Sequence, residues 1–282
     1  MQGSLSGGCV EEDLLEKLVK GELAEKEAQE FKYGVTAEDS EKFGLPCGGT
    51  LLTILEPLHP NLETINHFKA INGHVVARKN VRRVTNINTN ESSFELTEDR
   101  TSLSWNKDKN LLVQTFGPEF RLFIIGAGMV SQYLAEIALM LGYEVIVCDP
   151  REEFINEFEI NGVTLVNDMP DDAVKKYAND PASAIVALTH DPRIDDMGLM
   201  VALSSDAFYI GAMGSSRTSA SRRERLSQLD LTEKQISRLH APIGLPIGSK
   251  TPPEIAVAIL AEITAVRKNI ALADYKQSES AL

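Results

Sequence analysis

Short apolar segments alternate with helix-like segments throughout the second half of the chain. After Gly117-Pro118 the apolar segments are, in order, RLFIIGAG, YEVIVCDP, GVTLVN, SAIVALTHD and DAFYIGAMGS. A helical pattern runs from the first of them through Leu141, and further helical patterns separate the others. This alternation predicts an α/β fold, namely a Rossmann-like parallel sheet with right-handed crossovers and helices on both faces.

The first half of the chain has another pattern. Residues 11–31 predict an acidic amphipathic helix that Gly21 could interrupt, with apolar residues at helical spacing: Leu14, Leu15, Leu18 and Val19. Residues 51–55 form an apolar run between Gly48-Gly49 and Pro57, which predicts a buried strand that ends in a turn.

Between Asn72 and Phe116 the segments VRRVTNI, SSFELT and LLVQTF predict short strands joined by hairpin turns, and we find no candidate chemistry in them. A chain of 282 residues is long enough for two domains that each bury a core. We therefore expect a smaller N-terminal α+β domain over residues 1–118 and the Rossmann-like domain over residues 119–282.

The composition excludes several classes of function. A net charge of −13 repels nucleic acid and acidic membrane surfaces alike, so neither is an expected partner. The chain has no apolar run of membrane-spanning length, and its start lacks the basic and apolar regions of a signal peptide, which predicts a cytoplasmic protein. Its three cysteines are widely spaced and form no C-x-x-C pair, which argues for reduced thiols over disulfides or a zinc site.

A glycine-rich turn follows the first strand of the predicted parallel sheet. Gly126 and Gly128 stand where the backbone must turn and then approach a pyrophosphate at a helix N-terminus, and Ser131 replaces the usual third small residue. About 20 residues later, Asp149 ends the next strand, where it could accept hydrogen bonds from a ribose. The alternative is a tight strand-to-helix turn with an unrelated aspartate before Pro150.

Two more loops fall where strands of this sheet should end. His190, in Thr189-His190-Asp191, and Arg217, which follows Gly214 in GAMGSSR, could contact an anionic ligand. The alternatives are that the first loop only caps a helix and that Arg217 is a solvated helix residue. In the closing segment, His240 begins a turn-rich loop before Thr251-Pro-Pro-Glu, which predicts a helix start with a capping box. This histidine is a further ligand candidate; the alternative is that the loop only closes the sheet edge and that the helix from Ile255 to Ile263 packs its apolar face.

Two cysteines stand in glycine-rich sequence. Cys9 follows Gly7-Gly8 just before a predicted helix, where the helix dipole favours the thiolate and neighbouring glutamates oppose it. Cys47 precedes Gly48 and Gly49, which leave room for a large ligand to approach the sulfur. The alternative for each is a buried structural cysteine, and Cys148, which ends the run VIVC, fits that interpretation.

The motifs together resemble the xanthine dehydrogenase accessory factor (XdhC/CoxI) family. The segments that carry the resemblance, in matching order, are SLSGGCVEEDL, FGLPCGGTLLTILEPL, LFIIGAGMVSQYLAEIALMLGYEVIVCDPR, LTHD, YIGAMGSSR and HAPIGLPIGSKTPPEIAVAILAEI. The similarity extends from residue 4 to about residue 265 and is weakest between His67 and Phe116. Members of this family usually carry several dozen residues before the SGGCVE motif, so an upstream start, a fragment, or a shortened domain completed by a partner is expected.

The resemblance implies an accessory protein, with no catalytic residues of its own, that binds molybdenum cofactor and shields it. It also implies support for sulfuration of the cofactor and its insertion into an apo molybdenum hydroxylase. Cys9 and Cys47 would contact the cofactor and transiently its molybdenum, and Gly126 and Gly128 would hold its phosphate or dinucleotide tail. The cofactor is molybdopterin or its cytosine dinucleotide form, and the sequence does not distinguish the two.

Expected partners are a cysteine desulfurase or sulfurtransferase, a cofactor-synthesis enzyme, the apo hydroxylase and a second copy of the chain. Two other classes remain open on the residues alone. One is an NAD(P)-dependent oxidoreductase, which the glycine turn and Asp149 favour, although no acid–base pair stands out apart from the His190-Asp191 loop. The other is an adapter that only docks partners, in which the cysteines could be replaced by serine without loss.

Overall fold

The computed structural model describes residues 5, 8–23, 27–43, 50–100 and 103–270. The chain forms two compact units, Met1–Pro118 and Glu119–Leu282. We describe each unit by itself. Among the described helices, none combines the length and hydropathy that crossing a bilayer requires.

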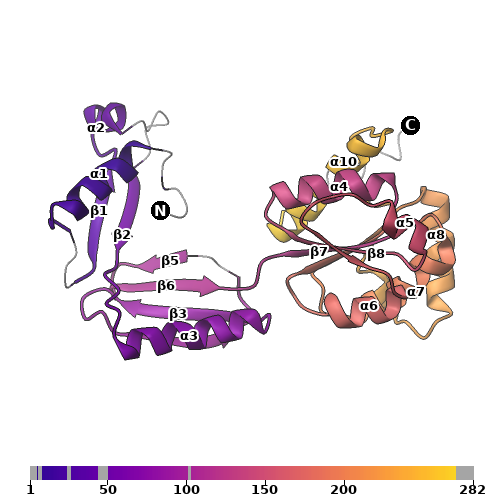
Figure 1. Ribbon diagram of the computed structural model, residues 1–282, viewed down its shortest axis with the longest axis horizontal. Helices are drawn as coiled ribbons and strands as arrows, with labels where there is room; N and C mark the ends of the chain where they lie inside the picture. Colours follow the sequence, from indigo (N-terminus) through magenta and orange to yellow (C-terminus); the bar gives the residue numbers. More distant parts are fainter. Residues whose placement is uncertain (1–4, 6–7, 24–26, 44–49, 101–102, 271–282) are drawn as a thin grey trace. The chain divides into compact units, whose positions relative to one another are not determined.

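The C-terminal unit is built on a six-stranded parallel sheet (Figure 1). Its strands, in chain order, are β7 Arg121–Ile125, β8 Glu144–Cys148, β9 Val163–Val166, β10 Ser183–Ala187, β11 Tyr209–Ala212 and β12 Leu239–His240. Their order across the sheet is β12-β11-β10-β7-β8-β9. With β7 counted as the first strand, this is the 3-2-1-4-5-6 order of the dinucleotide-binding fold, with the switch point between β7 and β10.

Helices cover both faces of this sheet, as the sequence predicts. They are α4 Met129–Met140, α5 Glu152–Asn156, α6 Pro170–Tyr177, α7 Pro192–Ala202, α8 Ser216–Ser227, α9 Glu233–Ile236 and α10 Pro252–Arg267. Alternate strand residues face opposite ways, so Leu122 and Ile124 pack with α4 and α10, whereas Phe123 and Ile125 pack with α6 and α7. The sheet is therefore buried on both faces, which explains its continuous apolar runs.

The predicted start of the last helix is confirmed. Thr251 is the N-cap of α10, prolines occupy its first turn, and the Glu254 carboxylate accepts hydrogen bonds from the backbone N–H groups of Lys250 and Thr251. Hydrogen bonds from these backbone groups hold the pKa of Glu254 below its ordinary value. The capping box thus fixes where the loop after β12 ends.

The N-terminal unit contains two antiparallel sheets. In the first, β1 Gln29–Tyr33 pairs with β2 Leu51–Leu55, beside the helices α1 Cys9–Val19 and α2 Ala37–Lys42. In the second, the order is β4-β3-β6-β5, and its strands are β3 Asn80–Asn86, β4 Ser92–Thr97, β5 Leu103–Asn106 and β6 Leu111–Phe116. The helix α3 Leu62–Val76 packs on β3 (Figure 1).

The prediction of one helix over residues 11–31 is wrong. The helix ends at Val19, Gly21 follows with a φ of 70°, and the chain enters β1 at Gln29. A positive φ is a conformation that glycine adopts freely and a helix cannot continue through. Phe31 and Tyr33 then alternate with polar residues along β1, which is the period of a strand and not of a helix.

Besides β1, three elements of this unit, α2, α3 and β5, are absent from the sequence prediction. The helix α3 begins at its N-cap Asn61, whose side chain accepts a hydrogen bond from Thr64 N, and its last five residues lie in a region predicted as strands. The edge strand β5 is short and mostly exposed, so it has no clear apolar alternation. The strands predicted at β2, β3, β4 and β6 are confirmed.

Candidate functional site

Four loops of the C-terminal unit follow the carboxyl ends of neighbouring strands. Gly126 and Gly128 follow β7, Asp149 follows β8, His190 follows β10, and the loop with Gly214 and Arg217 follows β11. Parallel strands end at the same edge of a sheet, so the structure brings these six predicted residues to one side of the unit. This carboxyl edge, at the switch point, is where open α/β sheets bind ligands.

Gly126 is required by the approach of two loops at the switch point. Its φ is 107°, and a Cβ atom there would lie 2.8 Å from Thr189 Cγ2 and 3.0 Å from the Thr189 backbone. Any larger residue would push the loop after β7 away from the loop after β10. Gly126 therefore has a structural role that does not depend on a ligand.

Gly128 differs from Gly126 because a Cβ atom there would have no described neighbour within 4 Å. It is the N-cap of α4, and no side chain among the described residues caps this terminus. A helix N-terminus with unfilled space and uncapped N–H groups attracts an anion. Ser131, which stands where the third small residue usually does, lies fully buried in the first turn of α4.

Asp149 is fully buried, and its carboxylate is already hydrogen-bonded. It accepts from Ala127 N at 2.9 Å, from Arg151 N at 3.0 Å, and from Arg151 Nε and Nη2 at 2.8 and 2.7 Å. Burial raises the pKa of Asp149, but the hydrogen bonds from Arg151 and Ala127 outweigh it, so the pKa lies below its ordinary value. Asp149 thus anchors the glycine turn, and a ribose could reach it only if Arg151 moved.

Arg151 is a residue that the sequence interpretation missed. Its guanidinium is paired with Asp149 and lies 3.8 Å from the centroid of the Phe154 ring, and its side chain remains 29% exposed. The available signal was its place directly after the strand end in the segment CDPR. A fixed, partly exposed cation at this edge would favour an anion placed at the N-terminus of α4.

The loop after β10 ends at the N-terminus of α7, which is capped by a side chain of the loop. Asp191 is the N-cap of α7 and accepts hydrogen bonds from Arg193, which lower the pKa of Asp191 to about 2. The helix-capping alternative is therefore correct for Asp191. His190 stands at the exposed tip of the loop with a φ of 62°, a conformation uncommon for histidine.

A buried ion cluster fixes two of the four loops. Asp195 accepts from Thr189 N and Oγ1 at 3.1 and 2.7 Å, and from Arg222 Nη2 at 2.9 Å. Arg222 also donates to Asp196 at 2.9 Å and to the carbonyl of Met213 at 2.9 Å. The cluster therefore joins the loop after β10 to the loop after β11.

Gly214 lies in the loop before α8, and Arg217 lies in the first turn of α8. A Cβ atom on Gly214 would lie 2.5 Å from Thr218 Oγ1, so a side chain there would disturb the start of the helix. Ser215 is the N-cap and accepts a hydrogen bond from Thr218 N. Arg217 is exposed on α8, which suits both a ligand contact and the solvated alternative.

The three cysteines have different surroundings. Cys9 is exposed and is the first residue of α1, after its N-cap Gly8. Cys47, Gly48 and Gly49 lie outside the described residues. Cys148 is buried in the core, its Sγ is 3.3 Å from the carbonyl oxygen of Asp168, and burial raises the pKa of its thiol to about 12, which confirms a structural cysteine.

A polar cavity of about 270 Å³ in the N-terminal unit was also missed. Arg83 lines it, lies 3% exposed, forms an ion pair with Glu56, and donates to Gln114 at 3.1 Å. Burial, with the nearby Arg83 cation, lowers the pKa of His67 in the same cavity. The available signal was the pair Arg82-Arg83 in a predicted strand, since adjacent strand residues face opposite ways.

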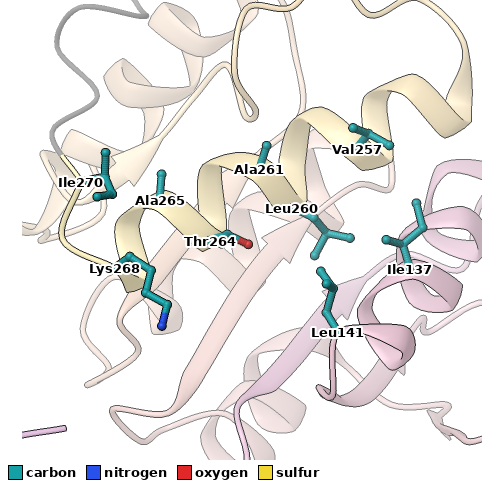
Figure 2. Close-up of a pocket in the computed structure, with 9 residues that line it drawn as sticks. All are labelled: Ile137, Leu141, Val257, Leu260, Ala261, Thr264, Ala265, Lys268 and Ile270. Carbon is teal, nitrogen blue, oxygen red and sulfur yellow. The ribbon is translucent and has the colours of Figure 1, made fainter. Parts of the chain in front are cut away.

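An apolar groove of about 420 Å³ runs between α4 and α10 (Figure 2). Ile137 of α4 and Leu141, directly after α4, face Leu260 of α10, and Lys268 follows the end of α10. Ligand sites combine an apolar lining with convergent polar groups. Among the described residues of this groove only Thr264 and Lys268 carry side-chain polar atoms, so it does not suit an anionic cofactor.

The strand order, the glycine turn and the loops at the switch point define a Rossmann domain, and its carboxyl edge is the candidate ligand site. The chain belongs to the XdhC family, because the model of the XdhC Rossmann domain matches residues 122–263, half of its length. The resemblance expected from the motifs is thereby confirmed.

Relatives and one solved structure match almost the whole chain. A probable xanthine dehydrogenase subunit of Bacillus subtilis (strain 168) is 28% identical over 96% of this chain and 86% of its own length. "Molybdenum cofactor insertion chaperone PaoD" of Escherichia coli (strain K12) is 27% identical over 94% of this chain and 74% of its own. The crystal structure of a xanthine dehydrogenase from Bacillus halodurans superposes with a TM-score of 0.72 at 26% identity, over 96% of this chain and 84% of that one.

Proposed function

We propose that this protein binds the molybdenum cofactor, protects it and inserts it into an apo molybdenum hydroxylase of the xanthine dehydrogenase or aldehyde oxidase type. Its membership of the XdhC family supports this, as does its similarity to a protein named as a molybdenum cofactor insertion chaperone. The observation that carries the proposal is the exposed thiol of Cys9 at the start of α1, which a metal centre can reach.

Cys9 and Cys47 are the pair that we propose contacts molybdenum transiently. Thiolates are soft ligands, and the cargo supplies a metal that accepts sulfur. The Glu11 carboxylate accepts hydrogen bonds from Leu5 N at 2.7 Å and Gly8 N at 3.1 Å, so it is turned onto the loop backbone. The N–H groups of Leu5 and Gly8 are thereby tied to a side chain of α1, and a Cβ on Gly8 would have no described neighbour within 4 Å.

The anionic end of the cargo fits the carboxyl edge of the C-terminal unit. The phosphate of molybdopterin, or the pyrophosphate of its cytosine dinucleotide form, would bind at the uncapped N-terminus of α4 beside Gly128. Arg151 supplies a nearby cation, and Asp149 holds both Arg151 and the glycine turn. His190, Gly214 and Arg217 would line the rest of this edge.

The proposal includes partners that exchange the cargo. A cysteine desulfurase or sulfurtransferase would supply the terminal sulfido ligand, a cofactor-synthesis enzyme would deliver the cofactor, and the apo hydroxylase would receive it. We propose that the chain acts in the cytoplasm as a homodimer, with the two units as separate domains. Sedimentation of the purified protein tests the dimer, because a monomer mass at all concentrations would exclude it.

The first experiment mixes the protein with molybdenum cofactor and measures molybdenum and pterin that remain bound after gel filtration. Wild type should retain both in stoichiometric amount. Cys9→Ser and Cys47→Ser should each lose most of the molybdenum, whereas Cys148→Ser is the matched control, since that thiol is buried in the core. If Cys9→Ser and Cys47→Ser retain as much molybdenum as wild type, the role of the cysteines is refuted. The remaining interpretations are then an adapter or a carrier that does not use thiols.

An NAD(P)-dependent oxidoreductase is the second candidate, and the 3-2-1-4-5-6 strand order with its glycine turn favours it. The carboxylate of Asp149, which a ribose would need, is occupied by Arg151. NADH and NADPH are therefore run in parallel through the same gel filtration. If only a nicotinamide nucleotide stays bound, the carrier proposal is wrong and an oxidoreductase activity must be sought.

A further inference from the structure

The loop after β12 is hydrogen-bonded to a fully buried carboxylate on α10. Glu262 of α10 is 0% exposed, and its Oε1 lies 3.0 Å from His240 Nδ1. Its Oε2 accepts hydrogen bonds from Tyr209 at 2.8 Å and from Gly244 N at 2.6 Å. Burial and the neighbouring Glu262 charge raise the pKa of Tyr209 well above its ordinary value, so this tyrosine remains a donor.

These contacts fix the orientation of the His240 ring and favour one of its tautomers. The ring stacks on Tyr209 with the centroids 4.5 Å apart, and its Nδ1 faces a carboxylate, which favours a proton on Nδ1. The side chain is 27% exposed although Glu262 is fully buried. The exposed edge of the ring is therefore the one away from Glu262, which carries Nε2.

His240 lines a cavity of about 420 Å³ formed mainly by residues 239–249. The other basic residue in its lining is Arg223 of α8, which donates to the carbonyls of Leu239 and Ala241 on either side of His240 at 2.9 Å each. Among the described residues that line this cavity, none is an aspartate or a glutamate. In a protein with a net charge of −13, a cavity whose ionisable lining is only basic indicates an anionic ligand.

We propose that this cavity binds a small anion, a phosphate monoester or a carboxylate, through Nε2–H of the His240 imidazolium, with Arg223 as the second cation. His240 takes up a proton from solvent when the anion binds, and Glu262 is the positioning residue that holds the ring and balances its charge. The site follows β12 and is distinct from the glycine turn after β7. It does not depend on the molybdenum cofactor assignment.

The competing explanation is that His240 and Glu262 only tie the loop to α10. Gly244 N already makes that connection, and a Cβ atom on Gly244 would lie 3.2 Å from Ala258, so the loop packs closely without the histidine. A structural histidine would neither exchange protons with solvent on anion addition nor respond to the identity of the anion. Those two responses separate the explanations.

The test uses the full chain with histidine labelled with ¹⁵N, titrated separately with inorganic phosphate and with acetate at one fixed pH. The signals of His240, assigned by their loss in His240→Gln, should begin as the Nδ1–H tautomer and shift saturably with one or both anions. Calorimetry in two buffers of different ionisation heat should detect proton uptake. A shift with phosphate alone or acetate alone identifies the anion class, and no shift with either overturns the proposal.

Variants then measure what each residue contributes. His240→Gln should weaken anion binding about tenfold or more, since a charge-assisted hydrogen bond is lost. Glu262→Gln should weaken binding and abolish the preference for the Nδ1–H tautomer; if that buried variant does not fold, His240→Gln still decides the question. The matched control is His74→Gln in the N-terminal unit. Unchanged affinity in His240→Gln would place the anion elsewhere and refute the site.

Discussion

Replacing Arg222 with methionine removes the cation from the buried cluster that joins two loops of the carboxyl edge. The Arg222 side chain is 7% exposed and pairs with Asp195, which is 2% exposed, and with Asp196, which is 12% exposed. Removing one partner of a buried pair leaves an uncompensated charge and costs about 3–5 kcal/mol. With an m-value of about 2 kcal/mol/M, the urea midpoint should fall by roughly 1.5–2.5 M.

The assay can follow the two units separately. The single tryptophan, Trp105, lies in the N-terminal unit, so its fluorescence reports that unit alone. Circular dichroism at a helical wavelength reports mainly the C-terminal unit, which contains seven of the described helices. Arg222→Met should shift the second transition and leave the Trp105 transition in place. Arg225→Met, in which a 43% exposed cation is lost from Asp196, is the matched control and should cost about 1 kcal/mol or less.

The pH dependence of Arg222→Met has a definite sign. Burial raises the pKa of Asp195 above its ordinary value of 3.8 even with its hydrogen bonds from Thr189, and loss of Arg222 raises it further. Above pH 3.8 the folded state then binds more protons than the unfolded state, so the stability of the variant should increase as the pH falls from neutral toward 3.8. Asp195→Asn in the same chain should recover part of the loss, and a midpoint for Arg222→Met equal to wild type would refute the reasoning.

Three further predictions concern single positions of the same unit. Gly126→Ala should destabilise it by more than about 1 kcal/mol in urea unfolding, because φ is positive and Thr189 is close, whereas Gly128→Ala should be near neutral; equal costs would contradict this. Asp149→Asn should cost about 1–3 kcal/mol at neutral pH, and this difference should decline as the pH falls below 3.8, since the folded pKa is lowered. Cys148 should resist a thiol reagent until urea unfolds the protein, and rapid labelling of the native chain at this position would refute its burial.

Much of the candidate site could be placed from the sequence. A glycine turn after an apolar strand, and polar residues at the next strand ends, are local patterns that parallel topology brings to one edge. Gly126, Gly128, Asp149, His190, Gly214 and Arg217 accordingly gather there. The pattern predicted no partner for any of them, because the hydrogen bonds from Arg151 to Asp149 depend on how the loop after β8 folds back.

The parallel sheet and its helices on both faces could be inferred from the order of residues alone, because continuous apolar runs and glycine positions follow from local burial and backbone conformation. The family was inferred separately, from the resemblance of the motifs to those of its members. The sequence alone does not predict that residues 29–33 form a strand paired with residues 51–55, since pairing depends on residues distant along the chain. The folded chain was also needed to show that the Glu262 carboxylate of α10 meets His240 and Tyr209. Side chains 22 and 53 residues apart leave no periodic signal, because it is the geometry of the packed core that brings them into contact.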